Sequence, residues 1–209
     1  YVDERTAIIN RIRGLLSEVG IVLPQKAETV RQRAGEALED LPTYMNQVIN
    51  DLIDELGHLD KRVQTYDVMI KEMARSNPNC KRLMQIGGIA EVTSSAIVAT
   101  IGNGHDFDNG RQFAAWIGLV PRQHGTGGKV KLGRITKMGD PYLRKLLVMG
   151  GRSVLQAAIN KTDRLSRWAL ALKERRGYAK AVVAIAAKNA RMAWAMLSKG
   201  QDYHQAQEA

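Results

Sequence analysis

The stretch MNQVINDLIDELGHLDKRVQTYDVMIKEM, residues 45–73, has the clearest periodicity in the chain. Its apolar residues follow one another at alternating spacings of four and three: Met45, Ile49, Leu52, Leu56, Leu59, Val63, Tyr66, Ile70 and Met73. Such spacing is the a/d pattern of a heptad repeat, sustained here for about four heptads. We therefore expect one long helix that forms a coiled coil over about residues 44–75, and a homodimer or higher oligomer built on it.

The same apolar seam also suits a long helix that packs against its own chain. A partner is available, because residues 6–19 place apolar side chains three and four apart and predict an amphipathic helix. Ile53 widens the seam, as packing on a second helix of the chain requires. Residues 25–41 predict a further, more polar helix that stops near Pro42. Both arrangements of the seam stay open at this point.

The charge balance changes sign after the break Ser76-Asn77-Pro78-Asn79. Residues 1–80 hold 10 Lys and Arg against 13 Asp and Glu, whereas residues 81–209 hold 21 against 8. Surplus charge that only maintains solubility would be scattered, so this concentration indicates a nucleic-acid-binding module joined to a scaffold. We predict two domains, a helical connector over 1–77 and a basic domain over 78–209.

The second part is expected to consist of short helices separated by glycine turns. Helix caps are predicted at Asp108 or Asn109, at Asp140 before Pro141, and at Thr162 or Asp163. Residues 130–132 are expected to form a short strand or an extended turn. Trp116, Trp168 and Trp194 lie on apolar helix faces, where we expect them in the core. The fold class is therefore mainly α.

A basic, glycine-rich segment, GLVPRQHGTGGKVKLGRITKMGDPYLRKLLVMGG at residues 118–151, carries the main functional signal. No Asp or Glu lies between Asp108 and Asp140. Glycines let a backbone approach a ligand closely, and unopposed cations suit phosphate. We therefore predict nucleic-acid contacts at Arg122, Gln123, His124, Gly127, Gly128, Lys129, Lys131, Arg134, Lys137, Arg144 and Lys145.

The turn Gly87-Gly88-Ile89-Ala90 between two expected helices resembles the hairpin of a helix-hairpin-helix element. In such an element tightly turned amides meet a DNA phosphate. The usual pattern is Ile-Pro-Gly-Ile-Gly, so Gly87 replaces the proline and Ala90 replaces the second glycine. Gly87 and Gly88 are added to the predicted contacts, with a plain turn between helices as the alternative.

Several other classes of function find no support in the residues. Cys80 is the only cysteine, which excludes a disulfide framework and favours the cytoplasm. No apolar run is long enough to span a membrane. No metal site is predicted, because the four histidines have no ligand spacing. The chain begins without Met, so we expect a piece of a longer protein.

A known family matches the order of motifs along the chain. The matching motifs are IGGI (86–89), ATIG (99–102), GRQFAAWIGLVPRQH (110–124), GGK (127–129), LGRITKMGD (132–140) and YLRKLL (142–147). They resemble the C-terminal domain of bacterial insertion-sequence transposases that carry an N-terminal RuvC-like DEDD nuclease domain, relatives of the Piv invertase. Residues 5–16, 20–25 and 179–197 are similar to flanking parts of the same family.

The resemblance implies a site-specific DNA recombinase that binds the DNA of its element and a structured bridge RNA. Its DEDD carboxylates, which hold Mg²⁺, lie upstream of the matched region, so no cofactor is expected in this chain. The family's serine nucleophile, in the pattern His-Ser-Ser-Gly-Gly or His-Ser-Thr-Gly-Gly, corresponds to Gly125, and Thr126 keeps a hydroxyl one residue later. His124 is a candidate acid or base beside them.

Whether the chain catalyses a reaction is therefore left open by the sequence. The main hypothesis is a transposase fragment that binds DNA and guide RNA and contributes to strand cleavage and exchange. The alternative is a non-catalytic nucleic-acid-binding protein derived from a transposase, which Gly125 and the missing carboxylates favour. A purely structural dimerisation protein would leave the basic segment unexplained.

Overall fold

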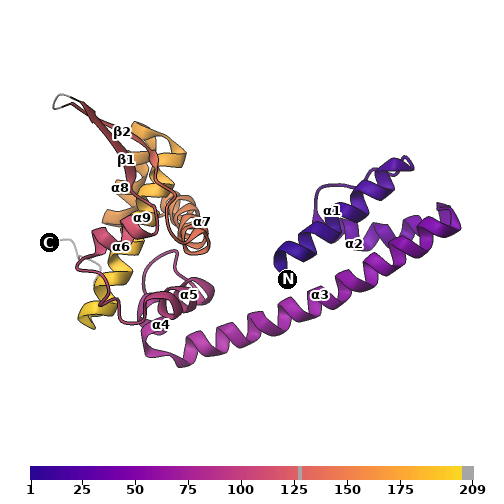
Figure 1. The fold of residues 1–209 in the computed structure, drawn as a ribbon, viewed down its shortest axis with the longest axis horizontal. Helices are drawn as coiled ribbons and strands as arrows, with labels where there is room; N and C mark the ends of the chain where they lie inside the picture. Colours follow the sequence, from indigo (N-terminus) through magenta and orange to yellow (C-terminus); the bar gives the residue numbers. More distant parts are fainter. Residues whose placement is uncertain (127–128, 204–209) are drawn as a thin grey trace. The chain divides into compact units, whose positions relative to one another are not determined.

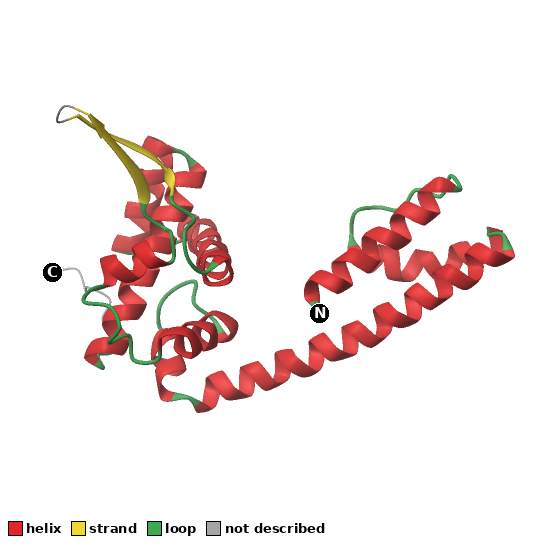
Figure 2. Ribbon diagram, in the orientation of Figure 1, coloured by secondary structure: helices red, strands yellow, loops and turns green. Residues whose placement is uncertain are grey.

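The computed structural model describes residues 1–126 and 129–203, with the backbone alone at positions 39, 40, 126, 129 and 130. The described chain is mainly helical, as predicted, and contains one two-stranded sheet (Figure 2). It divides into two compact units, residues 1–69 and 70–209. The sequence placed its domain boundary at the break after residue 77, whereas this division falls within a continuous helix.

The elements follow one another as labelled in Figure 1. Their bounds are α1 Val2–Glu18, α2 Ala27–Glu36, the 3-10 helix η1 Ala37–Asp40, α3 Thr43–Ser76, α4 Pro78–Leu83, α5 Glu91–Ile101, α6 Gly110–Trp116, β1 Pro121–Thr126, β2 Lys129–Ile135, α7 Pro141–Ala157, the 3-10 helix η2 Ala158–Asn160, α8 Arg164–Arg176 and α9 Tyr178–Lys199. No helix among the described residues combines the length and the apolar character that crossing a membrane requires.

The first unit buries the early half of the heptad seam inside its own chain. Ile49, Leu56 and Leu59 of α3 are almost fully buried in one cluster with apolar residues of α1 and α2. The later half differs, because Tyr66 and Met73 are each about half exposed. Packing within the chain therefore accounts for the early seam, and the predicted coiled-coil dimer stays a prediction for the rest.

Asp60 of α3 joins the three helices of the first unit. Its carboxylate accepts hydrogen bonds from Arg31 of α2, at 2.7 Å from Nε and 2.8 Å from Nη2, and one from Arg5 of α1 at 3.4 Å. The Arg31 hydrogen bond lowers the pKa of Asp60 most, and the charges of Arg31 and Arg5 lower it further. Because the folded-state pKa is depressed, this contact stabilises the unit above the unfolded pKa of about 4 and is lost as the pH falls through the folded value.

Replacing Asp60 by Asn should therefore lower the free energy of unfolding by about 1 kcal/mol at pH 7, since the site is partly exposed and screened. The difference from wild type should disappear at acid pH, where the wild-type carboxylate is itself protonated. Urea denaturation followed by circular dichroism at both pH values measures it. Asp67→Asn, on an exposed position of the same helix, is the control. Equal stability of Asp60→Asn and wild type at pH 7 would contradict the prediction.

The core of the second unit lies where α9 packs against α6, α7 and α8. Fully buried residues there include Phe113, Ile117, Leu143, Leu147 and Ile185. The predicted caps are confirmed as Asn109, Asp140 and Asp163, whose side chains accept hydrogen bonds from the first amides of α6, α7 and α8. These three local contacts fix where each core helix begins.

The glycine turn at residues 87–88 is part of this packing. Gly88 has a φ of +85°. It packs so closely against Gly150 of α7 that a Cβ on either residue would collide with backbone atoms of the other. The carbonyl of Gly87 accepts a 2.9 Å hydrogen bond from Nδ2 of Asn189, a buried residue of α9. Ala90 has extended backbone, so it does not take up the positive φ that a glycine would serve at the end of a helix-hairpin-helix turn. Positive φ and close packing account for Gly88, whereas a Cβ at Gly87 would make only an ordinary 3.8 Å contact with Val154. A phosphate contact at this turn stays a prediction.

Candidate nucleic-acid interface

Strands β1 and β2 of the basic segment form an antiparallel β-hairpin that extends beyond the helices of the second unit (Figure 1). The strands pair Pro121 with Ile135 and Gln123 with Leu132, with an irregularity between the two pairs. The sequence anticipated at most a short strand at residues 130–132, so the first strand is a correction. Gly127 and Gly128, predicted as backbone contacts, lie outside the described residues.

Register decides which positions of the hairpin share a face. His124 pairs with Lys131, and Gly125 pairs with Val130. Successive residues of a strand belong to opposite faces of the hairpin. His124 and Lys131, both exposed, therefore lie on one face, while Gly125 lies on the face of Gln123 and Leu132. A side chain introduced at position 125 would point away from the His124 imidazole.

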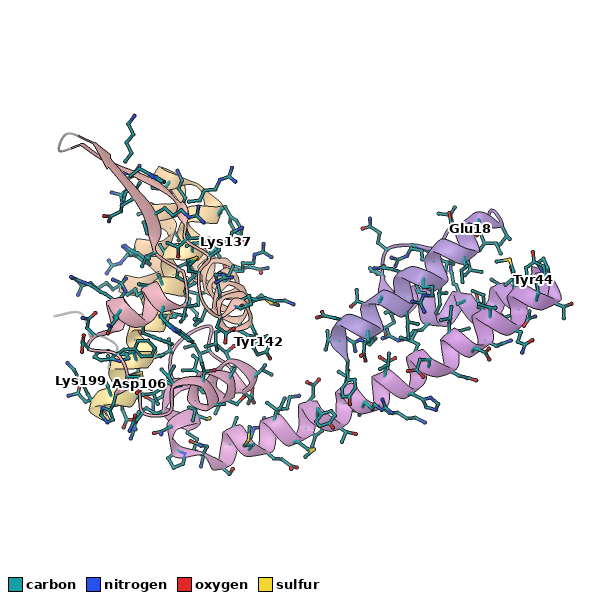
Figure 3. All side chains as sticks on the ribbon, viewed as in Figure 1. Glu18, Tyr44, Asp106, Lys137, Tyr142 and Lys199 are labelled. Atoms are coloured by element: carbon teal, nitrogen blue, oxygen red, sulfur yellow. The ribbon has the colours of Figure 1, made fainter. Side chains whose placement is uncertain are left out.

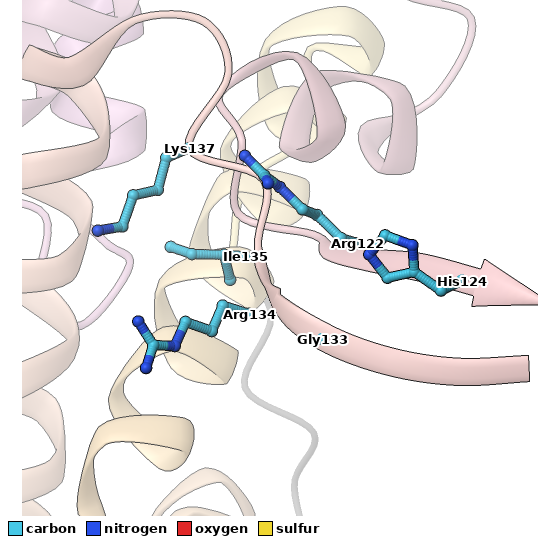
Figure 4. A pocket seen from close by; sticks show the side chains of 6 residues that line it. All are labelled: Arg122, His124, Gly133, Arg134, Ile135 and Lys137. Carbon is cyan, nitrogen blue, oxygen red and sulfur yellow. The ribbon is translucent and has the colours of Figure 1, made fainter.

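An open hollow of about 370 Å³ lies at the base of the hairpin (Figure 4). Its lining consists of Arg122, His124, Gly133, Arg134, Ile135 and Lys137. Three of these six residues carry permanent positive charge, and none carries a carboxylate. The structure thus brings together four predicted contacts, Arg122, His124, Arg134 and Lys137, although they are up to 15 residues apart in the chain. Grouped cations without an acid create a positive potential that attracts anions.

Backbone hydrogen bonds join the two segments that flank the hairpin to each other. The amide of Thr136 donates to the Val120 carbonyl at 2.9 Å, and the amide of Lys137 donates to the Gly118 carbonyl at 3.1 Å. Gly118 and Gly139 both have positive φ, +80° and +77°, and a Cβ at Gly139 would collide with the Trp116 carbonyl oxygen. Gly118 and Gly139 therefore allow the chain before β1 and the chain after β2 to cross in close contact at the base of the hairpin.

Lys137 is held in a backbone conformation that ordinary residues avoid. Its φ is +56°, and within the described part of the chain no other residue except glycine has a positive φ. The left-handed region costs an L-residue about 1–2 kcal/mol. Glycine would adopt this conformation without strain, whereas the chain keeps a lysine whose side chain lines the basic hollow. Strain retained at a charged surface is typical of functional positions.

Two predicted contacts on α7 have different environments. Nη1 of Arg144 donates to the carbonyl oxygens of Ile117, at 2.8 Å, and Met138, at 3.2 Å. Arg144 is half-buried, so its guanidinium is engaged in holding the base of the hairpin. Lys145 is exposed and carries no such contact among the residues that the structure describes. A phosphate contact at either residue stays a prediction.

The candidate catalytic positions lie at the far end of the hairpin, where β1 ends at Thr126 and pairs with Lys129. Only the backbone is described at these two residues. Within residues 1–126 and 129–203, no three His, Cys, Asp or Glu side chains gather in a way that could hold a metal ion. Asp106, labelled in Figure 3, is an exposed residue.

Two of the three tryptophans contradict the expectation of core positions. Trp116 is 41% exposed and Trp168 is 36% exposed. Trp116 lines a second open hollow, of about 560 Å³, together with Phe107, Gln112 and Asp106 among others. Only Trp194 matches the expectation in part, being half-buried with its Nε1–H donating to the Gly104 carbonyl at 2.9 Å. Sequence periodicity does not show how far an aromatic ring at the margin of a helix face is covered.

Comparison with known proteins identifies the family of the chain. Residues 80–167 match the transposase family IS116/IS110/IS902. The chain belongs to this family of insertion-sequence transposases. A probable family 20 transposase of Pseudomonas aeruginosa is 41% identical over 97% of the chain, and the transposase for insertion sequence element IS1111A of Coxiella burnetii is also 41% identical over 97%.

A more distant relative is the pilin gene-inverting protein of Moraxella bovis, 27% identical over 59% of the chain and 38% of its own length. The chain spans 61% of the length of the Pseudomonas protein and 57% of the Coxiella protein. Both relatives therefore contain a long part that this chain does not match.

Proposed function

We propose that this chain is the part of an insertion-sequence transposase that binds the DNA of the element and a guide RNA through its β-hairpin. The observation that carries the proposal is the hollow at the base of the hairpin, where Arg122, Arg134 and Lys137 gather with no carboxylate in the lining. Phosphate is the anion that nucleic acids present repeatedly, and neutralising it releases condensed counterions. Family membership supplies the biological context for such a surface.

The proposal includes a shared role in strand cleavage and exchange. Phosphoryl transfer by metal ions requires several converging carboxylates, and the described residues offer no such group. We propose that in the whole protein such carboxylates, and the Mg²⁺ that they would hold, belong to a nuclease domain outside the matched region. This chain would place the scissile phosphate and supply the nucleophile position at the end of the hairpin.

Gly125 occupies that nucleophile position and cannot attack phosphorus, because it has no side chain. Position 125 lies on the face opposite His124. The imidazole of His124 would therefore not be placed to accept the proton of a serine hydroxyl there. We infer that activation of a hydroxyl at this position depends on a group outside the described chain. We therefore expect weak or no strand exchange from the protein as it stands, and binding that does not depend on position 125.

The experiment uses the full-length protein and a donor plasmid that carries its insertion sequence. Gly125→Ser should raise strand exchange well above the level of the unaltered protein without changing affinity for DNA. Gly125→Ala, which adds a Cβ without a hydroxyl, is the matched control and should not gain activity. If Thr126→Ala abolishes residual exchange and Thr126→Ser retains it, the nucleophile lies at 126 instead. If no variant exchanges strands while DNA is bound, the protein is a non-catalytic binder.

A further inference from the structure

A second group of cations lies on α8 and α9, apart from the hairpin in the chain. These helices pack on each other and are joined through Gly177 alone. Arg164 begins α8, while Lys188 and Arg191 lie on α9. The Lys188 ammonium lies 4.7 Å from the ring centre of Trp168, over its face. Arg164 and Arg191 are exposed, and Lys188 is half-buried.

This arrangement is electrostatically unfavourable in the free protein. The pKa of Lys188 is lowered, first by burial and then by the positive charges of Arg164 and Arg191. Arg164 also occupies the first turn of α8, where the partial positive charge of a helix N-terminus disfavours a cation. Within residues 1–126 and 129–203, no carboxylate forms an ion pair with any of the three.

The nearest acid in the sequence does not compensate them, because it is already engaged. The carboxylate of Asp163 accepts hydrogen bonds from the amide of Ser166 at 3.2 Å and from its hydroxyl at 2.6 Å. A cation over an aromatic face is stabilising, which gives Lys188 a structural reason to lie on Trp168. This cation–π contact does not explain why Arg164 and Arg191 lie near Lys188.

An anion would remove the repulsion among the three cations. We propose that Arg164, Lys188 and Arg191 form a second surface for the sugar-phosphate backbone of a nucleic acid, separate from the hairpin. Lys180, an exposed residue of α9, lies two steps of four residues before Lys188. At 1.5 Å per residue, the row from Lys180 to Arg191 is roughly 16 Å long, which suits consecutive phosphates better than a small anion.

This surface rests on the proposed function and extends it to α8 and α9, where the sequence predicted no nucleic-acid contact. Lys188 and Arg191 lie beyond residues 80–167, where the family match ends. Two surfaces would let the unit bind two segments of nucleic acid, or two parts of one long segment, at once. Charges placed against local electrostatics are expected where a ligand supplies the missing counter-charge.

The test compares three versions of the chain, each binding a labelled DNA duplex and a labelled RNA hairpin over a range of salt concentrations. The first is Arg164→Gln/Lys188→Gln/Arg191→Gln. The second is Arg11→Gln/Lys26→Gln/Arg33→Gln, which removes the same charge from exposed positions of the first unit. The third is the unaltered chain. The α8–α9 variant should lose about 2 to 3 from the slope of log affinity against log salt on duplex DNA, and the control variant should lose little.

The result with the two probes identifies the ligand, because loss on the DNA duplex alone assigns the surface to DNA and loss on the RNA alone assigns it to RNA. Arg164→Gln should also raise the Tm of the free chain, which a purely structural arginine would not do. Unchanged slopes on both probes would overturn this surface, and so would an equal loss in the control. If the unaltered chain binds neither probe, the proposed function fails as well. If Arg122→Gln/Lys131→Gln/Arg134→Gln/Lys137→Gln loses affinity while the α8–α9 variant does not, only this surface is overturned and the proposed function stands.

Discussion

Replacing Arg122, Lys131, Arg134 and Lys137 together by Gln should nearly abolish binding of duplex DNA at physiological salt. Each phosphate contact contributes about 0.9 to the slope of log affinity against log salt, so four lost contacts should reduce the slope by about 3 to 4. Three of these residues line the same hollow and Lys131 lies beside it on the face of His124. Fluorescence anisotropy titrations over a salt series measure the slope directly.

A matched variant separates local contacts from overall charge. Gln at Arg11, Lys26, Arg33 and Lys61 removes the same four charges from exposed positions of the first unit, and it should change the slope much less. The two variants should unfold at temperatures near that of the wild type, since none of the substituted side chains is buried. Equal loss of affinity in both variants would show that only net charge matters and would contradict the hairpin as the binding surface.

Substituting Ala for Gly139 should strongly destabilise the base of the hairpin. Ala would have to adopt a φ of +77°, and its Cβ would collide with the backbone carbonyl of Trp116, which no side-chain rotation relieves. Positive φ costs about 1–2 kcal/mol, and forced displacement of packed backbone typically costs 1–3 kcal/mol more. We expect the free energy of unfolding to fall by about 2–5 kcal/mol and the Tm to fall by roughly 5–20 °C. Thermal melting followed by circular dichroism measures both.

Gly133 offers the control, because it lies in β2 and a Cβ there would make ordinary contacts, at 3.6 Å and 3.8 Å, with Arg122. Gly133→Ala should melt within a few degrees of the wild type. Because Gly139 fixes the segment that carries Lys137, Gly139→Ala should also weaken binding of DNA at temperatures where the unit stays folded. Wild-type stability of Gly139→Ala would show that the chain crossing at the base of the hairpin is not held as described.

The parts of the fold that could be predicted are those with local causes. Caps can be predicted at Asp140, at Asp108 or Asn109 and at Thr162 or Asp163, because a short polar side chain satisfies amides two or three residues away. The structure assigns Asn109 and Asp163 where two candidates were open. The long helix followed from its apolar period. That period is the same whether a seam packs on another chain or on its own, so the sequence did not show that Ile49 and Leu56 pack within the first unit.

The parts of the candidate site that escaped prediction depend on pairing between distant residues. Residues 121–126 contain no apolar side chain apart from proline, so β1 shows no alternating pattern, and only its pairing with β2 makes it a strand. The left-handed backbone at position 137 could not be predicted, because the residue there is a lysine and not the glycine that usually marks a positive φ. The hydrogen bonds of Arg144 to Ile117 and Met138 need a chain crossing that no local rule indicates. The positive charge itself was evident, because it is a property of composition.

The contact between Gly88 and Gly150 restricts how this protein can evolve. Elsewhere in a core, a substitution that is too large is often rescued by a smaller residue opposite it. Here both facing residues are already the smallest amino acid, and what they contact is each other's backbone. A mutation at either position has no compensating partner across the contact. Suppressor screens that start from Gly88→Ala should therefore return reversion to glycine, or changes that shift α7 as a whole, and no substitution at residue 150.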